Sequence, residues 1–417
     1  MISAKKLVIL ILILATAGCS STGSNSFKDM SSAYRDVIEQ YNNDNLLLNI
    51  IRVSNNMPMS FLDIPSIVGS GTIIKNANVS GLAVTTGSAT SSEAGIGFGM
   101  SINNSFSFTQ SSLDNNAFIS AFYKPIPLEA FGLKATERLR PRLIDYLLLV
   151  DEIQFKDKSG DLILLIENDP LTENFDQVLN TFRLLIELGL RVEQIEIKKP
   201  IGPTFDKLSA INQLGSEIIQ GVIKENLAID VVGTGSAKSY QLSRVVKENR
   251  FCINKFRTEE VLENLISPTM FCKISERLPK LDDAAANELR KILRRNPNLQ
   301  GLTFTFSVRS TGNVFDYLGN ILIASQRFPS RQINVTTSLT DHPTSRSYHS
   351  KPKPLFKIHV NKDDIKSVAN VNYRGNTYAV ADDDDTYTKM VLEYLSNLIT
   401  FAKVPGSIPP SPAIIMR

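Results

Sequence analysis

Few residues of this 417-residue chain have the types and spacing that catalysis or metal binding requires. Histidine is the usual proton carrier near neutral pH, and the chain has only three, His342, His349 and His359. His342 and His349 share one polar stretch with Asp341, but two histidines and a carboxylate lack the fixed ligand spacing of a zinc site. We interpret them as solvated loop residues and predict no metal.

Two further polar stretches look like ligand sites only superficially. The four adjacent aspartates at 382–385 lack the spaced ligands, central glycine and final glutamate of a calcium loop, so we expect Asp384 and Asp385 to cap the helix that follows. The sequence GTGSAKS at 233–239 lacks phosphate-loop spacing and precedes a strand, so it predicts a hairpin turn. We find no nucleophile elbow and expect no catalytic residue and no cofactor.

The N-terminus has the three parts of a secretory signal. Lys5 and Lys6 precede an apolar run at 7–14, which is shorter than the roughly 20 residues that span a membrane. Small residues at 15–18 then precede Cys19, and this end resembles the lipobox of bacterial lipoproteins. The resemblance implies cleavage after residue 18, a diacylglyceryl thioether on Cys19 and usually a third acyl chain, such as palmitate. Ser20 resembles the residue of lipoproteins sorted to the outer membrane, so we expect an anchor there and a body that faces the periplasm.

The remaining cysteines, Cys252 and Cys272, are candidates for a disulfide in an oxidising periplasm. A loop of this size would stabilise the fold by roughly 3 kcal/mol. The alternative is two separate buried thiols, since free cysteine packs as a small hydrophobe.

Composition excludes some partners. Hydrophobic residues make up 42% and charged residues 21%, as in ordinary globular proteins. The net charge is +3, and it falls to +1 when Lys5 and Lys6 leave with the signal. A charge this small argues against nucleic acid or an anionic membrane as the main partner. Other envelope proteins and further copies of the chain are the partners that we expect.

One segment has a clear strand pattern. Between 69 and 124 glycine, serine, threonine and asparagine dominate, and small residues alternate with apolar ones over 94–109. This period of two predicts a β-strand, with a less regular partner at 73–86 and a turn at 87–93. The apolar, candidate membrane-facing positions are Ile96, Phe98, Met100, Ile102, Phe106 and Phe108.

The rest of the chain predicts an α/β (mixed α+β) body. We divide it into the signal 1–18, a lipidated tether 19–26, an N-terminal helical segment 27–68, the Gly/Ser-rich β segment 69–124, an α/β domain 125–300 and a second one at 301–417. Predicted helices cover 27–52, 175–188, 205–227, 281–295, 312–326 and 386–402. Predicted strands cover 161–166 (buried), 191–197, 228–232, 239–245, 302–308, 356–360 and a pair within 368–380 that turns at Arg374-Gly375.

Three motifs suggest a family. They are NLLLNIIR at 45–52 followed by PMSFLDI at 58–64, then FSVRST at 306–311 with YLG at 317–319, and VNYRGNTY at 371–378. Their order and spacing resemble uncharacterised proteobacterial outer-membrane lipoproteins. The resemblance supports the predicted location in the bacterial envelope and implies no activity.

Three functions remain open. The first is a non-enzymatic lipoprotein whose body binds or scaffolds other envelope proteins. The second is an oligomeric secretion channel in which each copy contributes a hairpin, residues 72–109, to a shared β-barrel, because a strand of 9–11 residues can cross a bilayer. The third is an enzyme acting on the cell wall through two carboxylates, which 42 acidic residues do not exclude.

Overall fold

The computed structural model has a mixed α+β fold, as the sequence predicts. It describes residues 22–79, 96–113, 115–128, 131, 143–173, 175–206, 227–233, 238–256, 266–275, 301–328, 332–335, 352–362 and 364–403. The predicted helix 281–295, nearly all of the predicted helix 205–227 and the predicted turn 87–93 lie outside these residues. Within them, no helix is both long and apolar enough to cross a membrane.

Helix α2 (Thr22–Ser54) is longer than the predicted helix 27–52. Its C-terminal half has apolar residues at helical spacing, and four of them are fully covered: Leu46, Leu47, Ile50 and Ile51. The helix continues through the polar residues 42–44 because the C-terminal sheet holds two of them. Asn43 Nδ2 donates to the Val368 carbonyl (3.3 Å), and Asp44 Oδ1 accepts from the Asn370 amide (2.6 Å).

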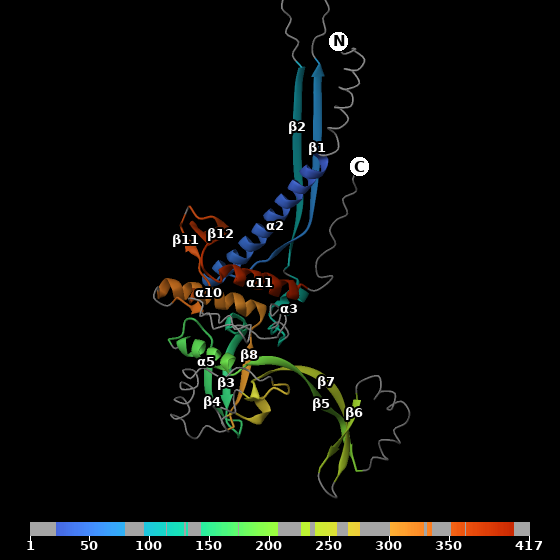
Figure 1. Ribbon diagram of the computed structural model, residues 1–417, viewed down its shortest axis with the longest axis vertical. Coiled ribbons are helices and arrows are strands. Elements are labelled where there is room, and N and C mark those ends of the chain that lie inside the picture. Colours follow the sequence, from blue (N-terminus) through green and yellow to red (C-terminus); the bar gives the residue numbers. More distant parts are fainter. Residues whose placement is uncertain are drawn as a thin grey trace, which may run out of the picture.

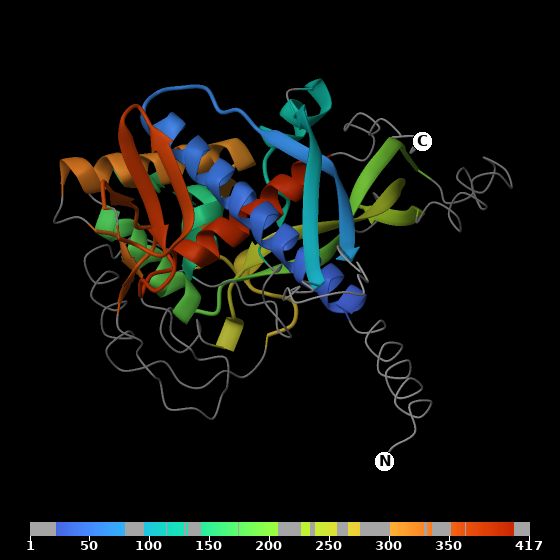
Figure 2. The same cartoon turned by 90° about the horizontal axis from the view of Figure 1, so that it is seen from above.

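Helix α2 packs on two helices from the other end of the chain, α10 (Thr311–Arg327) and α11 (Thr388–Ala402), and beside strand β12 (Ser367–Tyr373) (Figures 1 and 2). Gly319 of α10 permits the close approach of α2. A Cβ atom at Gly319 would lie 3.0 Å from Val53 Cγ1 and 3.2 Å from the Ser54 amide nitrogen. The first and last quarters of the chain therefore form one packed unit.

The C-terminal sheet confirms the predicted strand pair. Strands β11 (His359–Val360), β13 (Asn376–Ala381) and β12 lie in the order β11-β13-β12, all antiparallel. The turn between β12 and β13 has positive φ at Arg374 (50°) and Gly375 (81°), as a two-residue hairpin of type I′ requires. A short pair, β9 (Asn334–Val335) with β10 (Lys353–Pro354), lies nearby in sequence.

A second sheet contains β3 (Val150–Lys156), β4 (Leu162–Glu167) and β8 (Thr303–Val308), in the order β4-β3-β8. Helices α4 (Leu143–Leu149) and α5 (Phe175–Glu187) pack on each other beside it (Figure 1). Gly189 ends α5 as a C-terminal cap: it has φ 76°, and the Leu190 amide donates to the Leu185 carbonyl (2.8 Å).

The prediction that 161–166 is a buried strand is wrong. β4 lies at the edge of its sheet, and residues 162–165 are 40–54% exposed. An uninterrupted apolar run reads as buried by hydrophobicity alone, but the sequence does not show which strand lies at an edge.

A third sheet forms a curved arm that leaves the body (Figure 1). It contains β5 (Arg191–Phe205), β7 (Ser239–Cys252) and β6 (Leu227–Val232), in the order β5-β7-β6. The predicted strand 191–197 and the predicted hairpin 228–232/239–245 are confirmed, and both β5 and β7 run further than expected. At the base of the arm Cys252 and Cys272 form the expected disulfide, with Cα atoms 4.9 Å apart, beside η2 (Pro268–Met270).

The remaining ribbon is the antiparallel hairpin of β1 (Leu62–Val79) and β2 (Ile96–Ser112), followed by α3 (Asn116–Phe122). The predicted strand over 94–109 is confirmed as β2. The predicted partner over 73–86 begins too late, because β1 starts at Leu62. Pro65 interrupts the alternation there, and the register shifts between Asp63 and Ser66, so the pattern that predicts a strand does not extend back to Leu62.

Candidate functional site

The β1–β2 hairpin contains all six candidate membrane-facing residues, and all lie on β2. Its register runs from Leu62 opposite Ser112 at the body to Val79 opposite Ile96 at the far end. Successive pairs of a β-ribbon belong to opposite faces, so the register divides the hairpin into two rows.

The two rows differ in composition. The first row pairs Ile67–Phe108, Gly69–Phe106, Gly71–Asn104, Ile73–Ile102, Lys75–Met100, Ala77–Phe98 and Val79–Ile96. The second pairs Ser66–Thr109, Val68–Ser107, Ser70–Ser105, Thr72–Asn103, Ile74–Ser101, Asn76–Gly99 and Asn78–Gly97. The first row is thus apolar apart from one asparagine and one lysine, and the second row consists mostly of small polar residues.

The hairpin is rooted in an aromatic cluster. Phe61 is buried, and its ring lies 5.1 Å from Phe122, 5.3 Å from Phe315 and 5.9 Å from Phe118, centroid to centroid. The Leu113 amide donates to the Phe61 carbonyl (3.1 Å), which joins the two ends of the hairpin. The root is therefore fixed by buried packing of the kind that stabilises a core.

A buried amide on α2 also holds the root. Asn49 Nδ2 donates to the Ser60 carbonyl (2.9 Å), and Asn49 Oδ1 accepts from the Ser60 amide (2.7 Å). A small pocket lies beside this contact, between α2, the root and α11. It is lined by Asn42, Asn45, Leu46, Phe61, Leu62, Leu113, Ser396, Ile399, Thr400 and Lys403. None of these lining residues is a carboxylate, a histidine or a cysteine, so the pocket offers no proton-transfer pair.

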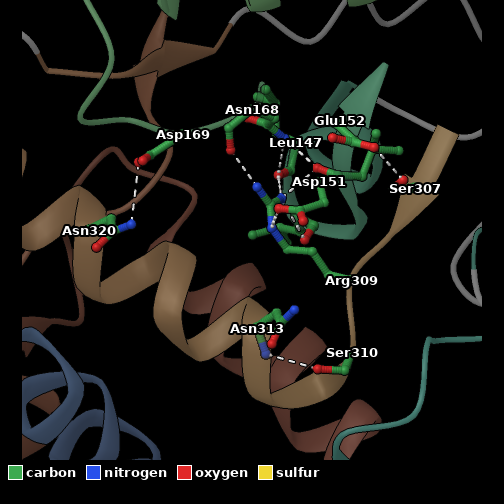
Figure 3. Close-up of polar contacts among 12 residues, drawn as sticks. Leu147, Asp151, Glu152, Asn168, Asp169, Ser307, Arg309, Ser310, Asn313 and Asn320 are labelled. Atoms are coloured by element: carbon green, nitrogen blue, oxygen red, sulfur yellow. Dashed lines mark hydrogen bonds and ion pairs between the residues drawn. The ribbon is translucent and has the colours of Figure 1, made fainter. Parts of the chain in front are cut away.

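A second polar cluster centres on the buried Arg309, which directly follows β8 (Figure 3). Its guanidinium donates to four main-chain carbonyls, those of Leu147, Leu148, Val150 and Asn168. Arg309 Nε lies 3.3 Å from Asp151 Oδ1, and its Cζ lies 4.1 Å above the Tyr317 ring. Arg309 thereby satisfies the carbonyls at the end of α4 and ties β3, β4 and α10 together.

Burial dominates the electrostatics of this cluster. It lowers the pKa of Arg309, which its carboxylate neighbours oppose, and it raises the pKa of the Tyr317 hydroxyl. Within the described residues, the Tyr317 hydroxyl and Asn168 Oδ1 have no hydrogen-bond partner. The role of Arg309 could not be predicted from the sequence, because its partners are main-chain carbonyls 141–162 residues away, which no motif records.

The aspartates at 382–385 do not cap the last helix, contrary to our prediction. Helix α11 begins at Thr388, and its N-cap, Tyr387, makes no side-chain capping hydrogen bond. Three of the aspartates instead form ion pairs, in the combinations Asp382 with Lys366 and Lys389, Asp384 with Lys357 and His359, and Asp385 with Lys353. Burial opposes ionisation of Asp384, but hydrogen bonds from His359 and Lys357 outweigh it and lower the pKa of that carboxyl. His359 Nε2 thus lies in a hydrogen bond with Asp384 Oδ2, which joins β11 to the segment before α11.

Glu193 and the two disulfide cysteines lie close enough together to suggest a metal site. The carboxylate is already occupied: Glu193 Oε1 accepts from Arg250 (2.7 Å and 2.9 Å), and Oε2 accepts from the Lys273 amide (2.9 Å). A cysteine binds a metal as its thiolate, and the disulfide between Cys252 and Cys272 provides none. These residues are better explained as the base of the arm.

The other candidate residues, Cys19, His342 and His349, lie outside the described part of the chain. Comparison with protein-family models, with curated proteins and with solved structures found no match for the sequence or the fold. The resemblance of the three motifs to proteobacterial outer-membrane lipoproteins stays a prediction.

Proposed function

We propose that this chain is a non-enzymatic lipoprotein of the outer membrane, anchored through Cys19, whose periplasmic body docks another envelope protein on strand β4. The observation that carries the proposal is the surface of that strand. Leu162, Ile163, Leu164 and Leu165 are four consecutive apolar residues, each between 40% and 54% exposed. Successive residues of a strand point to opposite faces, so apolar side chains are exposed on both faces of this edge strand, and such an edge favours pairing with another chain.

The other edge of the same sheet, at β8, has isolated bridges near the two ends of the strand, at Leu302 and Ser310. Beyond β8, Ile266 forms a parallel bridge with Leu302, and the Ser267 amide donates to the Leu302 carbonyl (2.9 Å). Among the described strands, β4 pairs with β3 alone. An exposed apolar edge strand invites pairing with another chain, and in the described part of the chain β4 offers such an edge.

Charge indicates the chemistry of the partner. Glu167 at the end of β4 lies opposite Glu152 of β3, and like charges in that position repel each other. Gln154 and Ser307 donate to Glu152, while Glu167 remains exposed. We infer that the docked segment is an apolar strand with lysine or arginine beside it, which would relieve this repulsion.

The polar clusters support a non-enzymatic role. In the part of the chain that the structure describes, Arg309, Glu193 and His359 are each engaged in contacts that join secondary-structure elements. None of them lines the pocket at the hairpin root.

Photocrosslinking in cells tests the docking strand. A photoreactive amino acid at position 164 of the full chain is expected to yield one crosslinked envelope protein, attached through an apolar segment with basic neighbours. Ile163→Lys should abolish the product without lowering the melting temperature, because Ile163 is 44% exposed. Val231 on the arm, 57% exposed, is the matched control position.

Two outcomes would overturn the docking role: the same products from positions 164 and 231, or a melting temperature lowered by several degrees in Ile163→Lys. The lipid anchor is tested separately. The mass of the N-terminal peptide should include two or three acyl chains, and Cys19→Ala should release the protein from the membrane fraction.

A further inference from the structure

The docking strand leaves the β1–β2 hairpin unexplained. The hairpin projects from the body as a single two-stranded ribbon and extends beyond the end of α2 (Figure 1). Among the described strands β1 and β2 pair only with each other, and a two-stranded ribbon alone is at best marginally stable in water. A ribbon of 17–18 residues per strand therefore needs a partner along its length.

Its composition is unusual for a ribbon surrounded by water. Across both strands the charged residues are Asp63 and Lys75, both on β1, and β2 has none. Soluble edge strands commonly carry charges that block pairing with other chains. The first row of pairs offers an apolar surface, and the second offers serine, threonine, asparagine and glycine.

This pattern fits the wall of a membrane pore. A transmembrane strand alternates apolar residues toward lipid with small polar residues toward the lumen. Crossing the hydrocarbon core takes about 9–11 tilted residues. The first row extends over 13 consecutive residues of each strand, from Ile67 to Val79 and from Ile96 to Phe108, which is sufficient.

The direction of the hairpin fits the lipid anchor. Thr22, the first residue of α2, lies three residues after Cys19, so the lipid attaches within roughly 11 Å of that helix end. In Figure 1 the N-terminal end of α2 points the same way as the hairpin. A lipid on Cys19 would therefore hold the hairpin tip toward the membrane.

We propose that the hairpin inserts into the membrane that holds the lipid, and that hairpins from several copies of this chain pair edge to edge into a closed transmembrane sheet around a pore. The first row faces lipid and the second row faces the lumen. Closure is required because an open strand edge in hydrocarbon leaves backbone groups without hydrogen bonds. This proposal rests on the lipid anchor at Cys19, which is part of the proposed function. It does not rest on docking at strand β4.

The test uses the full-length lipidated protein in vesicles of phosphatidylethanolamine and phosphatidylglycerol. We expect ring-shaped oligomers by electron microscopy, protection of residues 62–112 from protease, and single-channel conductance in a planar bilayer. Phe98→Asp and Phe106→Asp, in the first row, should reduce protection and channel formation at least tenfold. Ser101→Asp and Ser105→Asp, matched controls in the second row, should preserve protection and shift the selectivity toward cations.

Several results would overturn the pore. They are a monomer or dimer without conductance, equal effects of aspartate in both rows, or a fall of several degrees in the melting temperature of the body in the first-row variants, which would place the hairpin in a soluble sheet. Ile163→Lys should keep full conductance. Loss of the β4 crosslink with conductance retained, or the reverse, separates failure of one proposal from failure of the other.

Discussion

Two long antiparallel ribbons leave the same body, and they are built from opposite kinds of residue. The β1–β2 hairpin carries two charged residues in its strands, whereas β5 carries five, between 191 and 199, and β7 carries four, between 244 and 250. Ion pairs link the strands of the arm: Lys198 with Asp230, Lys199 with Glu248, and Arg250 with Glu193. The arm also has a third strand, β6, along one side of β7.

Both ribbons have the same antiparallel pairing, so the pairing alone does not show whether a ribbon suits water or membrane. The side chains make that difference. The charged side chains of the arm form ion pairs between strands. Such charges are compatible with a surface exposed to water, and they discourage pairing with the strands of other chains. The hairpin has only two charged residues, and among the described strands β1 and β2 pair only with each other, which agrees with the cover by further copies that we propose. The same contrast extends to the roots, since an aromatic cluster holds the hairpin and a disulfide holds the arm.

The largest effect is expected at the root of the hairpin. Phe61→Ala removes a buried ring that contacts three other aromatic rings, and should lower the free energy of unfolding by about 3–5 kcal/mol. Urea denaturation measures this change. Val37→Ala, at a residue 65% exposed on α2, should change it by less than about 0.5 kcal/mol. Equal effects of the two substitutions would mean that the hairpin is not anchored through Phe61.

Removing the disulfide comes next. The double substitution Cys252→Ser and Cys272→Ser opens a loop of 20 residues, and should lower the free energy of unfolding by about 3 kcal/mol. Proteolysis within the arm should accelerate, while cleavage of residues 62–112 in vesicles stays unchanged. If both ribbons became sensitive together, the two roots would not be independent.

A smaller effect is expected for Glu193→Gln. The substitution weakens the contacts with Arg250 and the Lys273 amide at the base of the arm, and should lower the free energy of unfolding by about 1–2 kcal/mol. Glu196→Gln, on the same strand at an exposed position, is the control and should have little effect. A thermal or urea transition distinguishes the two, and indistinguishable variants would assign the base of the arm to the disulfide alone.

The smallest effect concerns pH. Hydrogen bonds from Lys198 and Ser243, the Lys198 bond being the larger contribution, lower the pKa of Asp230 from its ordinary 3.8. A carboxyl with a lowered folded-state pKa stabilises the fold above its unfolded-state pKa, and that contribution disappears as pH falls through the folded-state pKa. Amide exchange in β6 and at the outer end of β7 should therefore increase below about pH 4. Lys198→Ala should remove most of this pH dependence, and an unchanged profile would contradict the role of the ion pair.

Much of this architecture could be predicted from local patterns. The period of two over 94–109 and the Arg374-Gly375 turn each identified an element correctly. What failed depends on distant neighbours. The burial of residues 162–166 in β4 depends on whether another strand lies beyond it in the sheet. The start of β1, the partner of β2, depends on a register that continues through Pro65. The carbonyls that engage Arg309 carry no side-chain signature at all.

The contact between Asn43 and Val368 joins residues 325 apart, and it constrains how the chain reaches its folded state. Synthesis at about 5–20 residues per second separates the two by on the order of half a minute. During that interval the N-terminal helix has been made, but the helices and sheet against which its apolar face packs have not. If lipid is attached to Cys19 early, an unfinished molecule waits at the membrane with that face open. Such an intermediate is a natural client for a holding chaperone, and its lifetime is set by the length of the chain that follows.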